Sequence, residues 1–399
     1  MSRYRILFVD DEENVLTGMR RMLRGQRNEW DMHFVLDAQA ALAVLATEVF
    51  DVIVSDMRMP GMDGAALLTE VRRLYPGMLR IILSGYSEQE SVMRTVGPAH
   101  QFLAKPCSSQ TVAEVISRGL ELRRVLESES LRRLVAGLKS LPSPSDTYYA
   151  LVSYLNNPMA SVSGVAEIIA HDVAMTVELL KVTNSAYFSL PSRVTTPLQA
   201  VRVLGLEIVA ALVLKVGVFR GFSGEAVTAR LMEDINRDSM FVGRLARHFG
   251  KMEQFESRAL EEAFCAGMLS SVGLLVLLDR MQGRFYRLKD ALGKGQDLLQ
   301  AELEVFGATH LQLGAYLLGL WGFNKAVVEA VALCGQPGLL PAERMHVAGA
   351  VHLARSLAGP SPAYGAGEGG RLKLDEAFFH SLGKTERLKR WSAEAVALR

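Results

Sequence analysis

Short apolar runs alternate with longer amphipathic stretches over the first third of the chain. Each run is short enough for a strand buried in a parallel sheet, and the runs cover residues 5–9, 52–54, 80–83 and 101–104. After the second run, Pro60, Gly61 and Gly64 mark a tight turn, and apolar residues at helical spacing follow between Leu67 and Leu74. This alternation predicts an α/β domain built on a parallel sheet.

From residue 144 onward the pattern becomes helical. No strand-like alternation follows Pro144, and amphipathic segments succeed one another instead. The first of these segments cover residues 147–155, 162–170, 174–183 and 197–204. The C-terminal part of the chain is therefore predicted to be all-helical.

Three further segments lie between or after these two parts. Residues 108–141 have a helical pattern throughout, but the apolar stripe that begins at Leu131 is out of phase with the one that ends at Ile116. Two interpretations remain open: a linker helix that carries a twist and pairs with a second copy of the chain, or a solvated helix with scattered leucines. Residues 358–370, rich in Gly, Pro, Ser and Ala, predict a flexible loop. The aromatic residues of 372–398 predict helices that pack back onto the protein.

Composition narrows the class of protein. A chain of 399 residues, of which 49% are hydrophobic and 22% charged, is expected to form two or three globular domains. Its net charge of +1 gives no overall field that favours nucleic acid or a membrane surface. The N-terminus lacks the pattern of a signal peptide, so we expect a cytoplasmic protein.

Residues 263–278 and 305–324 lack formal charge, and we interpret both as buried helices rather than membrane spans. The three cysteines are far apart and predict neither disulfides nor a zinc cluster.

Polar residues of complementary chemistry stand at the ends of the four apolar runs. Asp10 and Asp11 follow the first run, Asp56 the second, Ser84 the third and Lys105 the fourth. The carboxyl ends of parallel strands form one edge of the sheet, so we expect these side chains to converge. Crowded carboxylates raise one another's pKa unless a cation neutralises them, and Mg²⁺ suits that role. Such a set could transfer a phosphoryl group to Asp56, because this chemistry needs mainly positioning and charge neutralisation.

The same residues, in this order, resemble the motifs of response-regulator receiver domains. The matching features are Asp10-Asp11, Asp56 with the following MRMPGMDG, Ser84 and Lys105-Pro106. The resemblance covers residues 1–123 and implies a doubly wound, five-stranded parallel fold of the flavodoxin-like type. It also implies a cognate histidine kinase as the partner that supplies the phosphoryl group to Asp56.

The resemblance further implies a role for each residue of this edge. The ligands of Mg²⁺ would be Asp10, Asp11, Asp56 and the backbone carbonyl of Arg58. Ser84 would contact the phosphoryl group, and Lys105 would pair with it. Phe102 matches the aromatic switch position of the family, although an aromatic residue in an apolar strand is also an ordinary core residue.

A second resemblance concerns the helical part. The run HDVAMTVELLKVTNSAYFSLPSRVTTPLQAVRVLG, residues 171–205, has Asn184-Ser185 after a helix, then Tyr187-Phe188, a proline-marked loop and a helix closed by Gly205. It resembles the HDOD family, helical signalling domains related to HD phosphohydrolases. The implied HDOD domain covers residues 141–357, after a helical linker at 124–140. A loop at 358–371 and a C-terminal helical segment at 372–399 follow.

Metal-ligand chemistry bears on whether this domain is an enzyme. HD phosphohydrolases hold metals with histidines and aspartates from several helices, and here Ser270-Ser271 stand where a His-Asp pair would fall. The other corresponding positions carry Asp238, His310, Cys334 and Arg355. Catalytic metal sites usually keep three protein ligands, and a guanidinium would repel the cation, so we expect no metal in this pocket. His310, on an apolar helix, is interpreted first as a hydrogen-bonded core histidine.

The sequence therefore predicts a two-component response regulator. Phosphorylation of Asp56 would switch a non-catalytic HDOD domain that acts as an adaptor for a downstream signalling protein. A homodimer formed through the linker helix is a further expected partner arrangement. Two alternatives remain: a metal-dependent phosphohydrolase acting on a cyclic dinucleotide, and a domain that senses a nucleotide without cleaving it.

Overall fold

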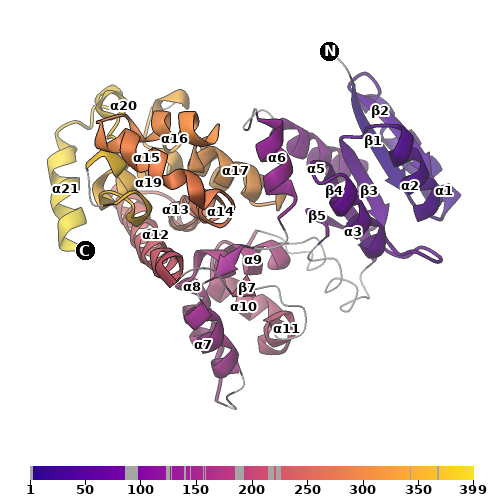
Figure 1. Cartoon of the computed structure of the whole chain (residues 1–399), viewed down its shortest axis with the longest axis horizontal. Coiled ribbons are helices and arrows are strands. Elements are labelled where there is room, and N and C mark those ends of the chain that lie inside the picture. The colour runs from indigo at the N-terminus through magenta and orange to yellow at the C-terminus, as the bar shows by residue number, and fades with distance from the viewer. Residues whose placement is uncertain are drawn as a thin grey trace. The chain divides into compact units, whose positions relative to one another are not determined.

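The computed structural model describes most of the chain. The described residues are 3–85, 98–122, 126, 128–138, 141–143, 145–155, 157, 159–184, 193–213, 220–221, 226–341, 343–365 and 368–399. They form two compact units. The first unit contains Met1–Lys139 with Lys181–Arg193 and Gly319–Gly322, and the second contains Ser140–Leu180, Val194–Leu318 and Phe323–Arg399. Figure 1 shows strands grouped in the N-terminal part, whereas helices make up nearly all of the rest.

The N-terminal part is built on a five-stranded parallel sheet with strand order β2-β1-β3-β4-β5. The strands are β1 (Tyr4–Val9), β2 (Trp30–Val35), β3 (Val52–Asp56), β4 (Leu79–Gly85) and β5 (Gln101–Lys105). The described helices between and after them are α1 (Glu13–Met22), α2 (Ala38–Thr47), α3 (Gly64–Leu74) and α5 (Ser109–Glu121). The order reverses between β1 and β3, which is the topological switch point of a doubly wound sheet. The predicted flavodoxin-like fold is confirmed.

Local sequence explains these elements. Ile53 and Val54 on β3 are at most 1% exposed, as expected of a central parallel strand covered on both faces. Three helices begin at a side-chain cap, because Asp37, Asp63 and Ser108 each accept a hydrogen bond from a backbone N–H in the first turn. The start of each helix, and hence the length of each βα loop, is therefore set locally.

The predicted continuous helix over 108–141 is wrong. α5 ends at Glu121, and a separate helix, α6 (Glu129–Ala136), begins after Ser128. The Ser128 hydroxyl accepts a hydrogen bond from the backbone N–H of Leu131 and caps the new helix. The out-of-phase stripes in the sequence reflect this interruption, since each stripe belongs to its own helix.

The C-terminal part is helical, as predicted. Its helices are α7 (Ser145–Leu155), α8 (Val162–Ala170), α9 (Val173–Thr183), α10 (Pro197–Leu204), α11 (Leu206–Ala211), α12 (Ala226–Met252), α13 (Ser257–Leu269), α14 (Val272–Met281), α15 (Phe285–Gly293), α16 (Leu298–Phe306), α17 (His310–Leu320), α18 (Lys325–Leu333), α19 (Val347–Ala358), α20 (Glu376–Ser381) and α21 (Arg387–Ala397). Among the described residues of this part, the strands are a two-residue parallel pair, β6 (Pro142–Ser143) with β7 (Arg220–Gly221). The long helix α12 packs against both α13 and α19.

The stretch Ser257–Gly293 is long and apolar enough to cross a membrane by length and composition alone. However, 83% of its most apolar window is buried inside the fold, as in the core helix of a soluble protein. The stretch is also divided, because α13 ends at Leu269 and α14 begins at Val272.

The segment after α19 differs from its predicted flexibility. Its composition predicts a loop at 358–371, yet Pro362–Tyr364 forms a 3-10 turn in which Ala363 and Tyr364 are buried. Tyr364 is held because its hydroxyl donates a hydrogen bond to Glu302 of α16. Further along, Trp391 of α21 is fully buried, and its ring lies 6.4 Å from that of Phe249 on α12.

Candidate functional site

The register of the sheet places the predicted polar residues along one edge. Val9 of β1 pairs with Ser55 of β3, so Asp10 and Asp56 follow at the same level on adjacent strands. Ser84 of β4 pairs with Ala104 of β5, next to Lys105. The carboxyl ends of β1, β3, β4 and β5 therefore carry a carboxylate, a second carboxylate, a hydroxyl and an ammonium.

Lys105 joins the two carboxylates. Its Nζ lies 2.7 Å from Oδ2 of Asp10 and also forms an ion pair with Oδ1 of Asp56. The second oxygen of each carboxylate is held by its own loop. Oδ1 of Asp10 accepts a hydrogen bond from the N–H of Glu12 at 3.0 Å, and Oδ2 of Asp56 accepts one from the N–H of Arg58 at 2.8 Å. Both side chains are thus oriented before any ligand arrives.

The loop after Asp56 depends on glycine. A β-carbon at Gly64 would lie 2.1 Å from the carbonyl oxygen of Asp56, a distance that no side chain tolerates. Gly64 is also the first residue of α3, and the N–H of Gly64 bonds to the carbonyl of Met57 at 3.0 Å. Gly61 has φ of +79°, in the left-handed region that glycine adopts without strain. The MPGMDG sequence therefore folds the start of α3 closely against the acceptor strand.

Burial and charge act in opposite directions on this site. Burial raises the pKa of Asp56 above its usual value, although the hydrogen bond and the charge of Lys105 oppose that rise. For Lys105, burial alone would lower the pKa, but the hydrogen bonds and charges of Asp10 and Asp56 outweigh it and the pKa is raised. Lys105 therefore stays cationic and supplies a fixed positive charge between two acids.

The donor set fits a hard dication. Asp10 and Asp56 each turn one oxygen toward the same nitrogen, and Mg²⁺ in proteins is usually held by one or two carboxylates with water completing its shell. Asp11, the next residue, is exposed at the same loop. Among the described residues, no group of three or more His, Cys, Asp or Glu side chains forms a metal cage. The Mg²⁺ roles predicted for Asp10, Asp11, Asp56 and the Arg58 carbonyl all stay predictions.

Ser84 and Phe102 occupy different environments. Ser84 is half-buried at the end of β4. Phe102 is 8% exposed, pairs in register with Ile82 and belongs to the hydrophobic core that also contains Val71. Phe102 thus serves as a core residue here, and its predicted switch role stays a prediction.

In the helical part, the predicted pocket residues have internal partners. Nη1 of Arg355 on α19 donates to Oδ2 of Asp238 on α12 at 2.6 Å, and both side chains are about nine-tenths buried. The hydroxyl of Ser270 donates to the carbonyl of Gly267 at 2.7 Å, whereas the buried hydroxyl of Ser271 has no hydrogen-bond partner among the described residues. The guanidinium neutralises the one carboxylate among the predicted pocket positions.

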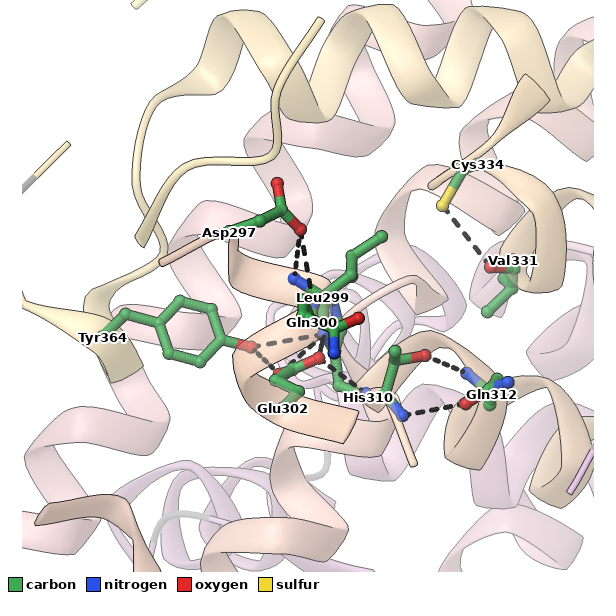
Figure 2. A network of polar contacts seen from close by, with 10 residues as sticks. Asp297, Leu299, Gln300, Glu302, His310, Gln312, Val331, Cys334 and Tyr364 are labelled. Carbon is green, nitrogen blue, oxygen red and sulfur yellow. Dashed lines mark hydrogen bonds and ion pairs between the residues drawn. The ribbon is translucent and has the colours of Figure 1, made fainter. Parts of the chain in front are cut away.

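His310 belongs to a second buried network (Figure 2). It is the first residue of α17, and its backbone N–H donates to Oε2 of Glu302 at 3.0 Å. Its ring Nδ1 also lies 2.8 Å from that oxygen, and the hydroxyl of Tyr364 donates to Oε1 of the same carboxylate. A negative side chain is favourable at a helix N-terminus, where the first backbone N–H groups lack partners. His310 is thus a hydrogen-bonded core histidine, as predicted.

Cys334 lies close to this region but is not bonded to it. It is fully buried, its Sγ contacts the carbonyl of Val331 at 3.4 Å, and burial raises the pKa of its thiol to about 12. Its own carbonyl lies 2.6 Å from Nδ1 of His352. A thiol of this kind stays protonated at neutral pH and is a poor metal ligand.

The sequence interpretation missed Glu302, Tyr364 and His352. A signal existed for Glu302, because it falls with Leu298, Ala301 and Phe306 on the buried side of α16. Tyr364 and His352 gave no comparable signal. Of the motif at 171–205, Asn184 is buried, and Ser185 and Tyr187-Phe188 lie outside the described residues.

A cleft of about 720 Å³ opens elsewhere in the helical part, between the end of α12 and the segment that leads into α19. Its walls include Glu253, Phe255 and Arg344. None of the six predicted pocket residues lines it.

Two family models match the chain. The response regulator receiver domain matches residues 6–117, and the HDOD domain matches residues 141–337. The first range contains Asp10, Asp56 and Lys105, and the second contains Asp238 and His310.

Curated relatives cover a smaller share of the chain. The hydrogenase transcriptional regulatory protein HoxA of Bradyrhizobium diazoefficiens is 34% identical over 122 residues, which are 30% of this chain and 24% of that protein. The C4-dicarboxylate transport transcriptional regulatory protein DctD of Rhizobium meliloti is 30% identical over 140 residues, which are 34% of this chain and 30% of that protein. The chain spans less than a third of the length of these relatives.

Solved structures include similar chains. The signal receiver domain of an HD domain-containing protein from Pseudomonas fluorescens Pf-5 is 29% identical, with a TM-score of 0.30, and covers 31% of this chain and 98% of its own. The MmoQ response regulator from Methylococcus capsulatus strain Bath is 21% identical, with a TM-score of 0.44, and covers 61% of this chain and 98% of its own.

On the two family matches and the sheet-edge residues, this chain belongs to the response regulators that join an N-terminal receiver domain to a C-terminal HDOD domain.

Proposed function

We propose that Asp56 accepts a phosphoryl group from a histidine kinase and that the added charge changes what a non-catalytic HDOD domain binds. The observation that carries the proposal is the convergence of Asp10 and Asp56 on the ammonium of Lys105. A carboxylate nucleophile, a neighbouring carboxylate and a fixed cation are the groups that phosphoryl transfer requires.

In the proposed reaction, a carboxylate oxygen of Asp56 forms a bond to phosphorus. The bond between phosphorus and the imidazole nitrogen of the kinase's phosphohistidine breaks, and that imidazole takes up a proton. The N–H of Arg58 and the ammonium of Lys105 hold Asp56 in place during transfer. Asp10, Asp11, Asp56 and the Arg58 carbonyl would hold Mg²⁺, which supplies neutralising charge to the phosphoryl oxygens.

The phosphoryl group carries about 1.5 to 2 negative charges, but the Asp56 carboxylate loses its own charge when the acyl phosphate forms, so the site beside Asp10 gains about one negative charge. This group can shift the protein from one state to another only as far as its interaction free energy differs between the two states. A near-complete shift requires a preference of about 5.5 kcal/mol. Lys105 is the described cation placed to supply part of that difference, because its Nζ contacts both acids.

The proposed adaptor role of the HDOD domain is supported by its buried ion pair. Arg355 places a permanent cation against Asp238, and a second cation there would be repelled. His310 is already engaged by Glu302 and Tyr364. Downstream binding, rather than hydrolysis, is the function these contacts favour.

Labelling by acetyl phosphate tests the acceptor. The wild-type chain should gain one phosphoryl group in the presence of Mg²⁺, measured by intact mass, and Asp56→Asn should gain none. Asp37→Asn is the matched control, because Asp37 is a surface N-cap and asparagine caps a helix equally well. Labelling that persists in Asp56→Asn would overturn the assignment of the acceptor.

Metal analysis tests the non-catalytic role. We expect the purified full chain, dialysed without chelator, to contain no stoichiometric transition metal. One or two equivalents per chain that disappear in Asp238→Asn would instead support the phosphohydrolase alternative.

A further inference from the structure

The receiver sheet contains a fully buried arginine at the end opposite the acidic site. Arg80, the second residue of β4, is 1% exposed. Its Nε donates to the carbonyl of Pro98 at 2.7 Å, and its Nη1 donates to the carbonyls of Pro76 and Met78 at 3.1 and 3.0 Å. Its Nη2 donates to the carbonyl of Ala136 at 2.7 Å. The rigid five-donor fork of arginine thus connects four backbone carbonyls from three separate segments.

His100 completes this arrangement. It is 3% exposed, immediately precedes β5, and its Nδ1 accepts a hydrogen bond from the backbone N–H of Arg80 at 3.1 Å. Because Nδ1 is the acceptor, the ring proton is on Nε2, which lies 3.0 Å from the carbonyl of Ala136 and donates to it. Burial and the charge of Arg80 hold the pKa of His100 well below its usual value, so the ring is neutral.

Ala136 is the last residue of the linker helix α6. The final carbonyls of a helix lack intrahelical donors and carry partial negative charge, so a buried guanidinium is a favourable partner. α6 also packs on the turn before β4, where a β-carbon at Gly77 would lie 3.0 Å from Cγ of Arg133. Arg80 and His100 therefore supply the hydrogen-bond donors that the buried carbonyl of Ala136 needs.

The strands that hold α6 are the strands that carry the phosphoryl site. β4 has Arg80 near its start and Ser84 near its end, and β5 follows His100 and ends at Lys105. The two strands are directly hydrogen-bonded, with Ile81 paired to Gln101. A shift of either strand at its carboxyl end therefore moves a residue that bonds to α6.

We propose that Arg80, His100 and the Ala136 carbonyl form a clamp that makes α6 part of the receiver and couples β4 and β5 to the start of the HDOD domain. The coupling, but not the attachment of α6, rests on the proposed phosphorylation of Asp56. The receiver then extends to about residue 138, beyond the boundary at 123 that the sequence predicts.

Amide hydrogen exchange of the full-length, unphosphorylated chain tests the attachment. His100→Leu keeps the size of the ring but removes both hydrogen bonds, and it should raise exchange of residues 129–138 by roughly tenfold. His100→Gln should stay close to wild type, because its amide can accept from Arg80 and donate to Ala136. Arg80→Lys, which keeps the charge but loses the fork, should behave like His100→Leu. Arg73→Lys, at an exposed arginine of α3, is the matched control.

The same variants test the coupling. His100→Leu should accept phosphate from acetyl phosphate at the wild-type rate, yet lose the change in exchange that phosphorylation produces in residues 141–184. Wild-type exchange of α6 in both His100→Leu and Arg80→Lys would overturn the clamp. If Asp56 accepts no phosphoryl group, the proposed function fails while the measurement on the unphosphorylated chain still decides the clamp. If His100→Leu does not fold, Arg80→Lys and His100→Gln give the same comparison.

Discussion

The two halves of the molecule treat a buried carboxylate in different ways. In the receiver, Asp10 and Asp56 share one lysine whose side chain is 28% exposed. In the helical domain, Asp238 has its own arginine, and that side chain is only 8% exposed. The first arrangement leaves a cation whose contacts would change with the proposed phosphorylation or metal binding. The second is an internal ion pair with no further demand for a ligand.

This contrast shows how charge can serve either chemistry or packing. Lysine is a flexible point charge, whereas arginine presents a planar fork that fixes its partners. The receiver uses lysine where the proposed phosphorylation would change the local charge. It uses arginine at Arg80 to hold backbone carbonyls in place. The helical domain likewise uses Arg355 to hold the carboxylate of Asp238 in place.

The largest effect is expected from breaking the internal pair. Arg355→Met leaves the Asp238 carboxylate buried without its cation, and should lower the free energy of unfolding by about 3–5 kcal/mol. Urea denaturation of the full chain measures it. Asp238→Leu combined with Arg355→Met should recover most of the loss, since no charge remains buried. A single variant as stable as wild type would show that the pair is solvated in solution.

A smaller loss of stability but a large loss of reactivity is expected at Lys105. Lys105→Met removes a partly exposed cation, so its electrostatic contribution to stability is partly screened by solvent. The rate of labelling by acetyl phosphate should fall about 10²–10³-fold, as when one charge-stabilising donor is removed from an active site. Added Mg²⁺ should restore the stability that the receiver of this variant loses, whereas it should not repair the loss in the helical domain of Arg355→Met. Unchanged labelling would remove Lys105 from the site.

The smallest effect concerns pH. Burial raises the folded-state pKa of Asp56 above 3.8, against the pull of Lys105. The stability this group contributes is therefore complete below its unfolded pKa and is lost as pH rises through the folded value. In metal-free buffer Asp56→Asn should be more stable than wild type near neutral pH, and the difference should close at acidic pH. Thermal unfolding of both chains from pH 3 to pH 8 measures this, and a variant less stable than wild type at neutral pH would contradict it.

Local patterns predicted four strands of the sheet and its acidic edge. No apolar run predicted β2, and the fifth strand came only from the family resemblance. The runs that end at Asp10, Asp56 and Lys105 identify their own strands, and parallel pairing then brings their ends together without further information. The break before α6 left a signal in the sequence, because Ser128 precedes an apolar stripe that is out of phase with the stripe before it. The helical pattern over 108–141 nevertheless predicted one continuous helix.

Long-range partners could not be read in this way. Arg80 looks like any residue at the start of a strand, and its partner Ala136 is 56 residues away. Glu302 and Tyr364 are 62 residues apart and meet only because the helices fold. Composition predicted a flexible loop around Tyr364, whereas the residue is buried and its hydroxyl contacts both Glu302 and His310.

The placement of Tyr364 has a practical consequence for anyone who prepares the HDOD domain. The family match ends at residue 337, and a fragment cut there would appear complete by homology. Such a fragment would lose Arg355 and the phenol that binds Glu302, and it would uncover Phe249, against which Trp391 rests. A fragment that folds and stays soluble should therefore extend through α21. If shorter fragments precipitate, the cause would be the exposed surface around Phe249 rather than poor expression.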